Sequence, residues 1–410
     1  LLPFIQNLDL WKIMIYILLF TYYVCLALVY DVGQYQRHRQ LHFFISLALM
    51  ILVSGLRYRI GSDTVVYMDD FKYYPDLFHL QWNDFSDVRY DPFWVLLNVC
   101  CKTLCNDFFL VQCVVSMIHI VIWGKFVKKV CPTLCFSMVL FYYMFEYTKQ
   151  NMEVMREAVA LAFFLLAILA LNERKTWKVV LYVITAFLFH KFSLVVFGLF
   201  YGFYLVYSLK KIYVIPIITF FIVMPIIQRD WIYMVIGNIL SLDTVYTKEI
   251  MFYATSDTYT MTEYNWKGIL SIFLLMFIYI FMNLKCRREY GSYVQLNEKI
   301  FESAIFFSIL LISLKYSFMI VFRLYDYFQT FTSLLIIIMF IKSVRCYSLN
   351  KRFLLYFLFL SVPSFFTIKR YQAEFDLNPN VASYLRYYPY NSVLNPKKDR
   401  DRELFIFNYK

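Results

Sequence analysis

The chain has 410 residues, of which 61% are apolar and only 17% are charged. Soluble domains are roughly 45 to 50% apolar and about 25% charged, so this composition excludes an ordinary soluble globular protein and indicates that much of the surface faces lipid. Nine glycines and ten prolines are too few for collagen-like, low-complexity or long-linker sequence. We therefore expect a single transmembrane domain over residues 1–410.

The net charge of +12 does not indicate a nucleic-acid-binding protein. The lysines and arginines occur in short clusters between apolar runs, which is the pattern that membrane insertion produces. Most cysteines lie inside apolar segments, where cysteine behaves as a small hydrophobic residue. Cys131 and Cys135 are four residues apart but have no histidine or acidic residue nearby, so no metal site is predicted.

Apolar segments long enough to cross a bilayer recur along the chain. A transmembrane helix needs about 20 such residues, and this criterion predicts an all-α, polytopic membrane protein with about 12 spans. The first segment has no basic region before it and no small-residue cleavage site after it, so it is interpreted as a span and not as a signal peptide. The predicted spans are approximately residues 11–30, 41–56, 108–124, 132–148, 152–171, 177–190, 192–208, 212–228, 268–284, 300–321, 324–341 and 353–368.

A shorter apolar segment, Pro92–Leu104, is followed closely by Asn106 and Asp107 and is interpreted as a re-entrant or interfacial helix. Charge tests this interpretation, because cytoplasmic loops are enriched in lysine and arginine. If the amino terminus is outside and this segment does not cross, every inside loop is basic; if it crosses, the basic clusters from Lys125 onward fall outside. The predicted extracytoplasmic regions are then the loops 57–91 and 229–267 and the tail 369–410.

Ionisable side chains gather at the outer ends of these spans. They are Arg57, Arg59, Glu153, Arg156, Glu157, His190, Lys191, Lys315, Arg323 and Asp326. Some have structural explanations: Arg59 and Lys191 can extend to the interface, and Arg156 and Arg323 can pair with the acidic residue three positions away. Charges at membrane depth usually face a cavity or a partner, however, and cations from several spans suit an anionic ligand such as a lipid-linked diphosphate.

Six short segments carry a resemblance to a known family. Residues 55–71, with the sequence GLRYRIGSDTVVYMDDF, resemble the signature of EpsG-type proteins, which are relatives of the Wzy O-antigen and capsule polymerases. The other segments that resemble family motifs, in the family's order, are residues 91–98, 150–160 around Arg156, 189–193 around His190, 323–328 and 387–393. Glu157 departs from the pattern, since a neutral polar residue is expected after Arg156.

The resemblance implies an all-helical, GT-C-like glycosyltransferase in the bacterial cytoplasmic membrane, with its active site facing the periplasm or exterior. Such an enzyme polymerises O-antigen, capsule or exopolysaccharide: it transfers a glycan from undecaprenyl diphosphate to another lipid-linked repeat unit and releases undecaprenyl diphosphate. The implied partners are the lipid-linked donor and acceptor, membrane lipid and a chain-length regulator, and no nucleic acid. The absence of a glycine-rich phosphate loop agrees with a metal-independent reaction that uses no nucleotide sugar or other cofactor.

The chemical step displaces a diphosphate at an anomeric carbon, so cations must stabilise the charge that develops on the leaving group. Arg156 and Arg323 are predicted to do this. The further predicted substrate contacts are Arg57, Arg59 and Lys315.

The acceptor hydroxyl needs a general base. His190 is the first choice because histidine titrates near neutral pH, and Asp63 is the alternative. Gly61 is expected to permit a turn before the helix that follows it. The predicted sugar-stacking side chains are Tyr67, Trp82, Tyr388 and Tyr390, for which an interfacial aromatic belt is the competing explanation.

Two other classes of protein compete with the polymerase. A transporter or flippase of lipid-linked glycan also needs a cationic cavity, but it is expected to show internal repeats and charges near the bilayer midplane. An O-antigen ligase or acetyltransferase has a similar architecture without this order of motifs. Accumulation of lipid carrying one repeat unit distinguishes the polymerase from a flippase, whose loss retains that unit in the cytoplasm.

Overall fold

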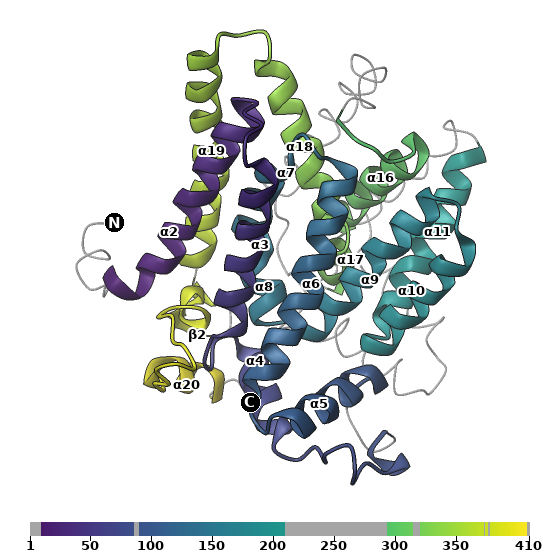
Figure 1. Ribbon diagram of the computed structural model, residues 1–410, viewed down its shortest axis with the longest axis vertical. Helices are drawn as coiled ribbons and strands as arrows, with labels where there is room; N and C mark the ends of the chain where they lie inside the picture. Colours follow the sequence, from purple (N-terminus) through teal and green to yellow (C-terminus); the bar gives the residue numbers. More distant parts are fainter. Residues whose placement is uncertain are drawn as a thin grey trace. The chain divides into compact units, whose positions relative to one another are not determined.

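The computed structural model describes residues 10–85, 90–209, 293–314, 320–372, 374–375 and 378–407 (Figure 1). The predicted spans 212–228 and 268–284, the predicted loop 229–267 and Lys315 lie outside these residues. The chain divides into two compact units. The first comprises Leu1–Leu194 and Phe340–Lys410, and the second comprises Val195–Met339.

The first unit is built almost entirely of helices. Within it, α9 packs against α6 and α10, and α3 packs against α6. Its elements are α2 (Leu10–Leu26), a π-helical turn (Ala27–Val32), α3 (Arg39–Gly55), α4 (Ser62–Phe71), a 3₁₀ turn (Trp82–Phe85), α5 (Pro92–Leu104), α6 (Phe109–Val130), α7 (Cys135–Phe145), α8 (Tyr147–Met152), α9 (Met155–Asn172), α10 (Thr176–Phe189), α19 (Leu349–Gln372), β1 (Glu374–Phe375), β2 (Asn378–Ala382), a 3₁₀ turn (Ser383–Arg386) and α20 (Arg400–Phe407).

The second unit contains most of α11 (Phe192–Leu209), then α16 (Glu298–Leu314), α17 (Ile320–Asp326) and most of α18 (Gln329–Val344). Aromatic side chains form its centre. Phe328, in the turn between α17 and α18, packs edge-on against Phe307 of α16, with ring centroids 5.0 Å apart, and against Phe200 of α11 at 5.4 Å.

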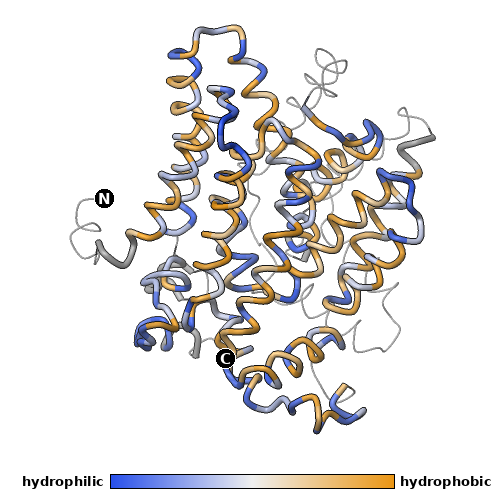
Figure 2. Tube along the Cα trace, viewed as in Figure 1, coloured by the Kyte–Doolittle hydropathy of each residue, from blue (hydrophilic) through white to orange (hydrophobic). Residues whose placement is uncertain are grey.

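Membrane residence is supported by the helices themselves. Among the described residues, four helices are long and apolar enough to cross a bilayer: Met14–Val32, Phe109–Val130, Met155–Asn172 and Leu349–Gln372. Large apolar side chains such as Leu18, Phe44 and Phe357 are exposed on these and neighbouring helices. Figure 2 shows that hydrophobic residues make up most of the helices. A soluble protein rarely leaves so much apolar surface uncovered, whereas lipid covers it without cost. The prediction of about 12 spans stays a prediction.

Several helix boundaries differ from those predicted. The predicted spans 132–148 and 152–171 contain two breaks, at Glu146 and around Glu153, which isolate α8 between α7 and α9. The boundary predicted between spans 300–321 and 324–341 falls inside α17, and the turn lies at Tyr327 and Phe328 instead. The tail is not purely irregular or helical, because β1 and β2 pair antiparallel with Glu374 opposite Ala382. Hydropathy averaged over a long window misses these features because apolar residues flank each break and tertiary contacts hold it.

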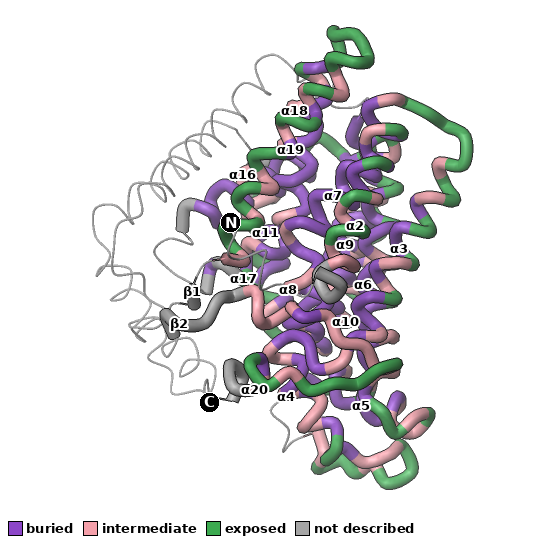
Figure 3. The backbone as a smooth tube through the Cα atoms, turned by 90° about the vertical axis from the view of Figure 1, so that its left-hand side faces the viewer, coloured by how far each residue is buried: buried purple, intermediate pink, exposed green. Residues whose placement is uncertain are grey.

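The short segment at Pro92–Leu104 does form a helix, α5, of 13 residues. Pro92 occupies its first turn, where the missing N–H of proline costs no hydrogen bond. Its inner face, including Trp94, Val95 and Val99, packs in one core with residues of α4, α6 and α9. Figure 3 shows the buried middle of α6 and α9 in this unit. Small buried residues on α9, among them Ala158 and Ala162, allow its neighbours to approach closely.

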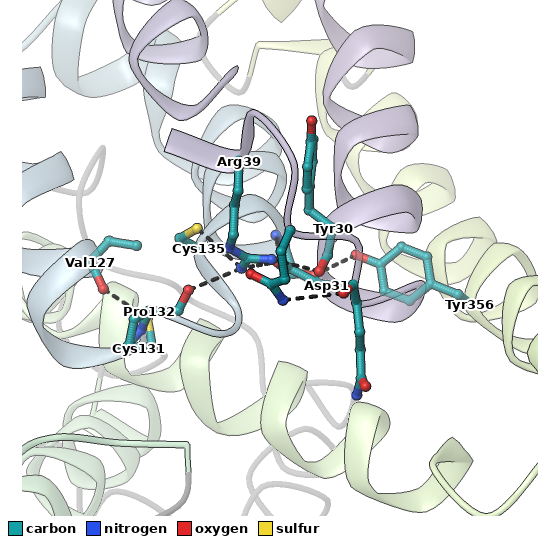
Figure 4. Close-up of polar contacts among 11 residues, drawn as sticks. Tyr30, Asp31, Arg39, Val127, Cys131, Pro132, Cys135 and Tyr356 are labelled. Carbon is teal, nitrogen blue, oxygen red and sulfur yellow. Dashed lines mark hydrogen bonds and ion pairs between the residues drawn. The ribbon is translucent and has the colours of Figure 1, made fainter. Parts of the chain in front are cut away.

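A buried ion pair fixes the opposite end of the first unit (Figure 4). Arg39, at the start of α3, pairs with Asp31 at 2.8 Å and also donates to the carbonyl oxygens of Tyr30 at 2.6 Å and Pro132 at 3.0 Å. The other carboxylate oxygen of Asp31 accepts the backbone N–H of Ser137 at 2.6 Å. Asp31 therefore caps the start of α7, although it lies far from α7 in the sequence. The dipole of α7 favours the negative charge of Asp31 at this end of the helix.

Candidate functional site

The candidate site lies where α3 ends and α4 and α9 begin. Gly61, which directly precedes α4, has φ +92°, a backbone conformation that favours glycine. A Cβ at this position would lie 1.7 Å from the carbonyl oxygen of Met152. The hydroxyl of Thr64 donates to the same carbonyl at 2.7 Å. The turn expected at Gly61 is confirmed, and it presses the start of α4 against the break between α8 and α9.

Arg57 is fully buried beneath this turn. Its guanidinium donates to the Ser54 carbonyl, to Thr64 Oγ1 at 3.0 Å and to Met155 Sδ at 3.1 Å. No carboxylate lies within ion-pairing distance among the residues that the structure describes. Burial lowers the pKa of Arg57 to about 10, so the side chain still carries its charge at neutral pH. With its donors used inside the protein, Arg57 holds the turn in place and presents no surface to a substrate.

Glu153, in the break before α9, connects three segments. Its carboxylate accepts hydrogen bonds from Ser62 at 2.5 Å and from Tyr387 at 2.5 Å, and it pairs with Arg386 at 3.0 Å. Burial alone raises the pKa of Glu153, but the charge of Arg386 and the two hydrogen bonds outweigh it, so the pKa lies below the ordinary value of 4.5. Glu153 thus joins α4, α9 and the carboxy-terminal segment.

This arrangement gives a pH-dependent stability. The pKa of Glu153 is depressed in the folded protein, so its stabilisation is complete above the ordinary pKa of 4.5 and is lost as the pH falls through the lower folded value. In purified protein we expect Glu153→Gln to reduce the free energy of unfolding at pH 7 by about 2 to 4 kcal/mol. The free energy of unfolding of this variant should also fall less steeply below pH 4.5 than that of the parent protein. Thermal unfolding measured across a range of pH tests both expectations.

Glu173→Gln is the matched control, because Glu173 also has two partners, Lys129 and Lys175, but is partly exposed. Its expected effect is below about 1 kcal/mol. Equal stabilities for Glu153→Gln and the parent protein at every pH would rule out the joining role.

The segment after β2 lies along the residues that follow α3. Backbone hydrogen bonds join Tyr58 N–H to Asn391 O at 2.8 Å and Gly61 N–H to Arg386 O at 2.9 Å. Arg59 forms a two-pronged ion pair with Glu403, and the buried Arg402 donates to the Arg59 carbonyl at 3.2 Å. The side chain of Arg59, predicted as a substrate contact, is therefore committed to the tail.

Arg156 is held differently, by aromatic rings and one carboxylate. Its Nε donates to the Tyr67 hydroxyl at 3.2 Å, and its guanidinium lies 4.6 Å from the ring centroid of Tyr90. Its Nη1 is 3.5 Å from Asp91 Oδ2. The alternative pairing with Glu153 is wrong, because Glu153 lies in the break, outside α9, and pairs with Arg386. Part of the Arg156 side chain remains exposed.

Asp91 pairs with a second cation, Lys191, in addition to Arg156. Its Oδ1 is 3.7 Å from Lys191 Nζ, in the turn between α10 and α11, and the Lys191 side chain is 46% exposed. Burial raises the pKa of Asp91, although the charges of Arg156 and Lys191 oppose this. Both ion pairs are long for contacts between charged groups, which are usually 2.7 to 2.9 Å. Two cations, one from α9 and one from the turn after α10, thus share one loosely held carboxylate.

His190 lies beside Lys191 at the end of α10. Its Nδ1 is 3.3 Å from the backbone N–H of Phe192 and accepts a hydrogen bond from it. Because a neutral imidazole carries one proton, that proton then resides on Nε2. His190 is therefore arranged to donate a hydrogen bond from Nε2, and its basic nitrogen is already engaged.

The remaining predicted residues fall in several places. Asp63 is partly buried in the first turn of α4, and Tyr67 is buried one turn later, with its ring 5.0 Å from that of Trp94. Tyr390 donates to the Val53 carbonyl at 3.0 Å, and Tyr388 packs against the ring of Tyr384. Tyr67 is buried, whereas Tyr388 and Tyr390 are partly exposed, and their predicted contact with sugar rings stays a prediction. Arg323 is exposed on α17 in the second unit.

Sequence reasoning missed the roles of Tyr90, Asp91, Arg386 and Arg402. An available signal was Asp91 directly before Pro92, since an acidic residue before proline marks a helix start. Asp399 caps the start of α20, because its carboxylate accepts the N–H of Arg402 at 2.9 Å. Within the described chain, no group of three histidine, cysteine or acidic side chains is placed to hold a metal ion.

Comparison with known proteins gives one match. The model of the EpsG family matches residues 40–392, which is most of the chain. A search of curated proteins and a search of solved structures each returned no match. The matched range contains Gly61, Asp91, Glu153, Arg156 and Lys191, which form the site described above.

Proposed function

The chain belongs to the EpsG family, a family of Wzy-type polymerases, and from this we propose that it joins oligosaccharide repeat units carried on undecaprenyl diphosphate, releasing undecaprenyl diphosphate. The donor glycan is transferred to a second lipid-linked unit. The reaction takes place at the outer face of the bacterial cytoplasmic membrane. The observation that carries the proposal is the pair of cations, Arg156 and Lys191, that converge on Asp91.

A diphosphate fits this pair of cations. Its oxygens can take the place of the Asp91 carboxylate between the planar guanidinium of Arg156 and the ammonium of Lys191. Tyr67 and Tyr90 keep the guanidinium in position before the ligand arrives. Such preorganised charge is what a developing diphosphate leaving group requires, because no rearrangement of the protein is needed during the reaction.

The bond changes follow from this placement. The acceptor hydroxyl oxygen forms a bond to the anomeric carbon of the donor, and the bond from that carbon to the diphosphate oxygen breaks. Arg156 and Lys191 stabilise the departing diphosphate, and the Nε2–H of His190 donates to one of its oxygens. The hydroxyl proton passes to Asp63, which shares a face of α4 with Tyr67 because the two residues are four positions apart.

The rest of the proposal concerns the setting of this site. About 12 spans in a GT-C-like arrangement place both termini outside, together with the loop 57–91 and the tail. Arg323 and Lys315 are further diphosphate contacts. The reaction needs no metal, and a separate regulator sets chain length.

The test is a deletion strain in which lipid-linked glycans are extracted and their side of the membrane is determined. We expect a lipid diphosphate carrying one repeat unit to accumulate where a non-permeant oxidant reaches it, with no polymer. Retention of that unit on the cytoplasmic side would instead identify a flippase. Long polymer that stays on its lipid carrier would identify a ligase, and either result contradicts the proposal.

A further inference from the structure

Three large aromatic side chains stand exposed in the segment between α4 and α5. Tyr73, Phe78 and Trp82 are 86%, 85% and 86% exposed, whereas most aromatic residues of the first unit are packed in its interior. We call residues 72–85 the aromatic loop. An exposed tryptophan and phenylalanine on one short loop require an explanation, because they are the residues that gain most from being covered.

The aromatic loop is held in shape by hydrogen bonds. Lys102 of α5 donates to the carbonyl oxygens of Phe71, Lys72 and Tyr74 at 3.1, 2.9 and 2.5 Å. The Leu77 N–H donates to Thr103 Oγ1 at 2.8 Å. Both contacts tie the first half of the loop to α5. The aromatic side chains are thus displayed on an ordered scaffold, which lowers the entropy cost of binding a ligand.

The second half has its own turns. The Asp76 carboxylate accepts the N–H groups of Phe78 and His79, both at 3.0 Å, and Asp84 accepts the N–H of Gln81 at 2.7 Å. These contacts fix the backbone on either side of Trp82. Hydrogen bonds within the loop itself therefore hold the backbone that carries Phe78 and Trp82, and no partner is needed for this.

Residues that precede and follow the aromatic loop in the chain belong to the candidate site. The Tyr90 hydroxyl, after the loop, donates to Asp70, before it. Tyr67, also before the loop, and Tyr90 are the residues whose rings contact Arg156. A molecule bound along the loop is thus directed toward the place where the proposed reaction occurs.

Charge argues against a lipid surface as the ligand. The segment from α4 through the loop carries five aspartates and one lysine, Lys72; the aspartates are Asp63, Asp69, Asp70, Asp76 and Asp84. Anionic lipid surfaces attract clusters of basic residues and repel carboxylates. Carboxylate and amide groups beside an exposed ring instead accept hydrogen bonds from hydroxyls while the ring covers an apolar face. That is the chemistry of a glycan.

We propose that the aromatic loop binds the glycan chain of the lipid-linked substrate, with Trp82, Phe78 and Tyr73 stacking on its sugar rings. This inference rests on the proposed polymerase function and adds the surface that holds the polymer. The loop retains the chain near Arg156 between successive additions. Its loss therefore shortens the product without preventing the first linkage.

The test compares the lengths of polymer made by strains with loop variants at equal protein level. Trp82→Ala combined with Phe78→Ala is expected to shift the ladder to short chains, while Trp82→Phe, which keeps an aromatic face, restores longer ones. Trp177→Ala is the control, since Trp177 is 66% exposed but lies at the start of α10, away from the loop. An unchanged ladder in the double variant overturns the proposal.

Binding gives a second readout. Polysaccharide isolated from the same strain is titrated against purified protein, and the affinity of Trp82→Ala should be about three- to tenfold weaker than that of the parent. In vesicles containing brominated phosphatidylcholine, quenching of tryptophan emission that is lost in the Trp82→Phe variant would show that the loop enters lipid and would overturn the proposal. If the polymerase function itself fails, the deletion strain does not accumulate lipid-linked single units, whatever the loop variants do.

Discussion

Arg156→Ala is expected to abolish long polymer and to lower the rate of polymerisation by about 10² to 10³-fold, the usual effect of removing a group that stabilises developing charge. The arginine has the position that this role needs, with its Nε on Tyr67 and its Nη1 beside Asp91. Gel analysis of the polymer, together with the rate on lipid-linked substrate in membranes, measures the effect.

Arg156→Lys refines the test. Lysine keeps the charge but loses the planar fork and the stacking on Tyr90, so an intermediate rate is expected. Arg37→Ala is the control, because Arg37 is exposed and lies at the opposite end of α3. Long polymer from the Arg156→Ala strain, at a normal level of folded protein, would falsify the assignment of Arg156 to the diphosphate.

Gly61→Ala is expected to disrupt the site through its backbone. A left-handed conformation costs a non-glycine residue about 1 to 2 kcal/mol, and the methyl group would also overlap the Met152 carbonyl, 1.7 Å away. The backbone must then move, which separates α4 from the break before α9. A loss of about 3 kcal/mol or more in unfolding free energy is expected, with loss of polymer. Thermal unfolding of the purified protein measures it.

Gly198→Ala is the matched control for this substitution. Among the described residues, no atom beyond the chain neighbours and the backbone of α11 lies within 4 Å of a Cβ placed at Gly198, and alanine is the better helix former inside α11. This variant should be as stable as the parent or slightly more so. If Gly61→Ala behaves in the same way, the close approach at Met152 is not needed for the fold.

The comparison of sequence and structure is clearest at the two arginines of the first motif. Arg57 and Arg59 were predicted as substrate contacts because they follow a span and belong to the resemblance. The structure places Arg57 under the turn at Gly61 and joins Arg59 to Glu403, which is 344 residues away. A sequence motif shows that a residue type is required but not which atoms it contacts. Structural and catalytic arginines therefore look alike in the sequence.

Arg156 illustrates the reverse case. Its role at the diphosphate stays a prediction, but the alternative pairing with Glu153 is wrong, because the carboxylate beside Arg156 belongs to Asp91. The error came from assuming one continuous helix, on which residues three apart share a face. The break before α9 removes that relation, and α5 supplies the carboxylate instead.

The sequence by itself determined the membrane character, the helical class, the glycine turn at Gly61 and the family, because these depend on composition, on apolar length and on local backbone limits. Only the tertiary structure decided which charges meet. The pairing of Arg156 and Lys191 with Asp91, and of Glu153 with Arg386, joins residues that are 65 to 233 positions apart. Ion pairs of this kind depend on distances of a few ångströms between helices, and packing sets those distances.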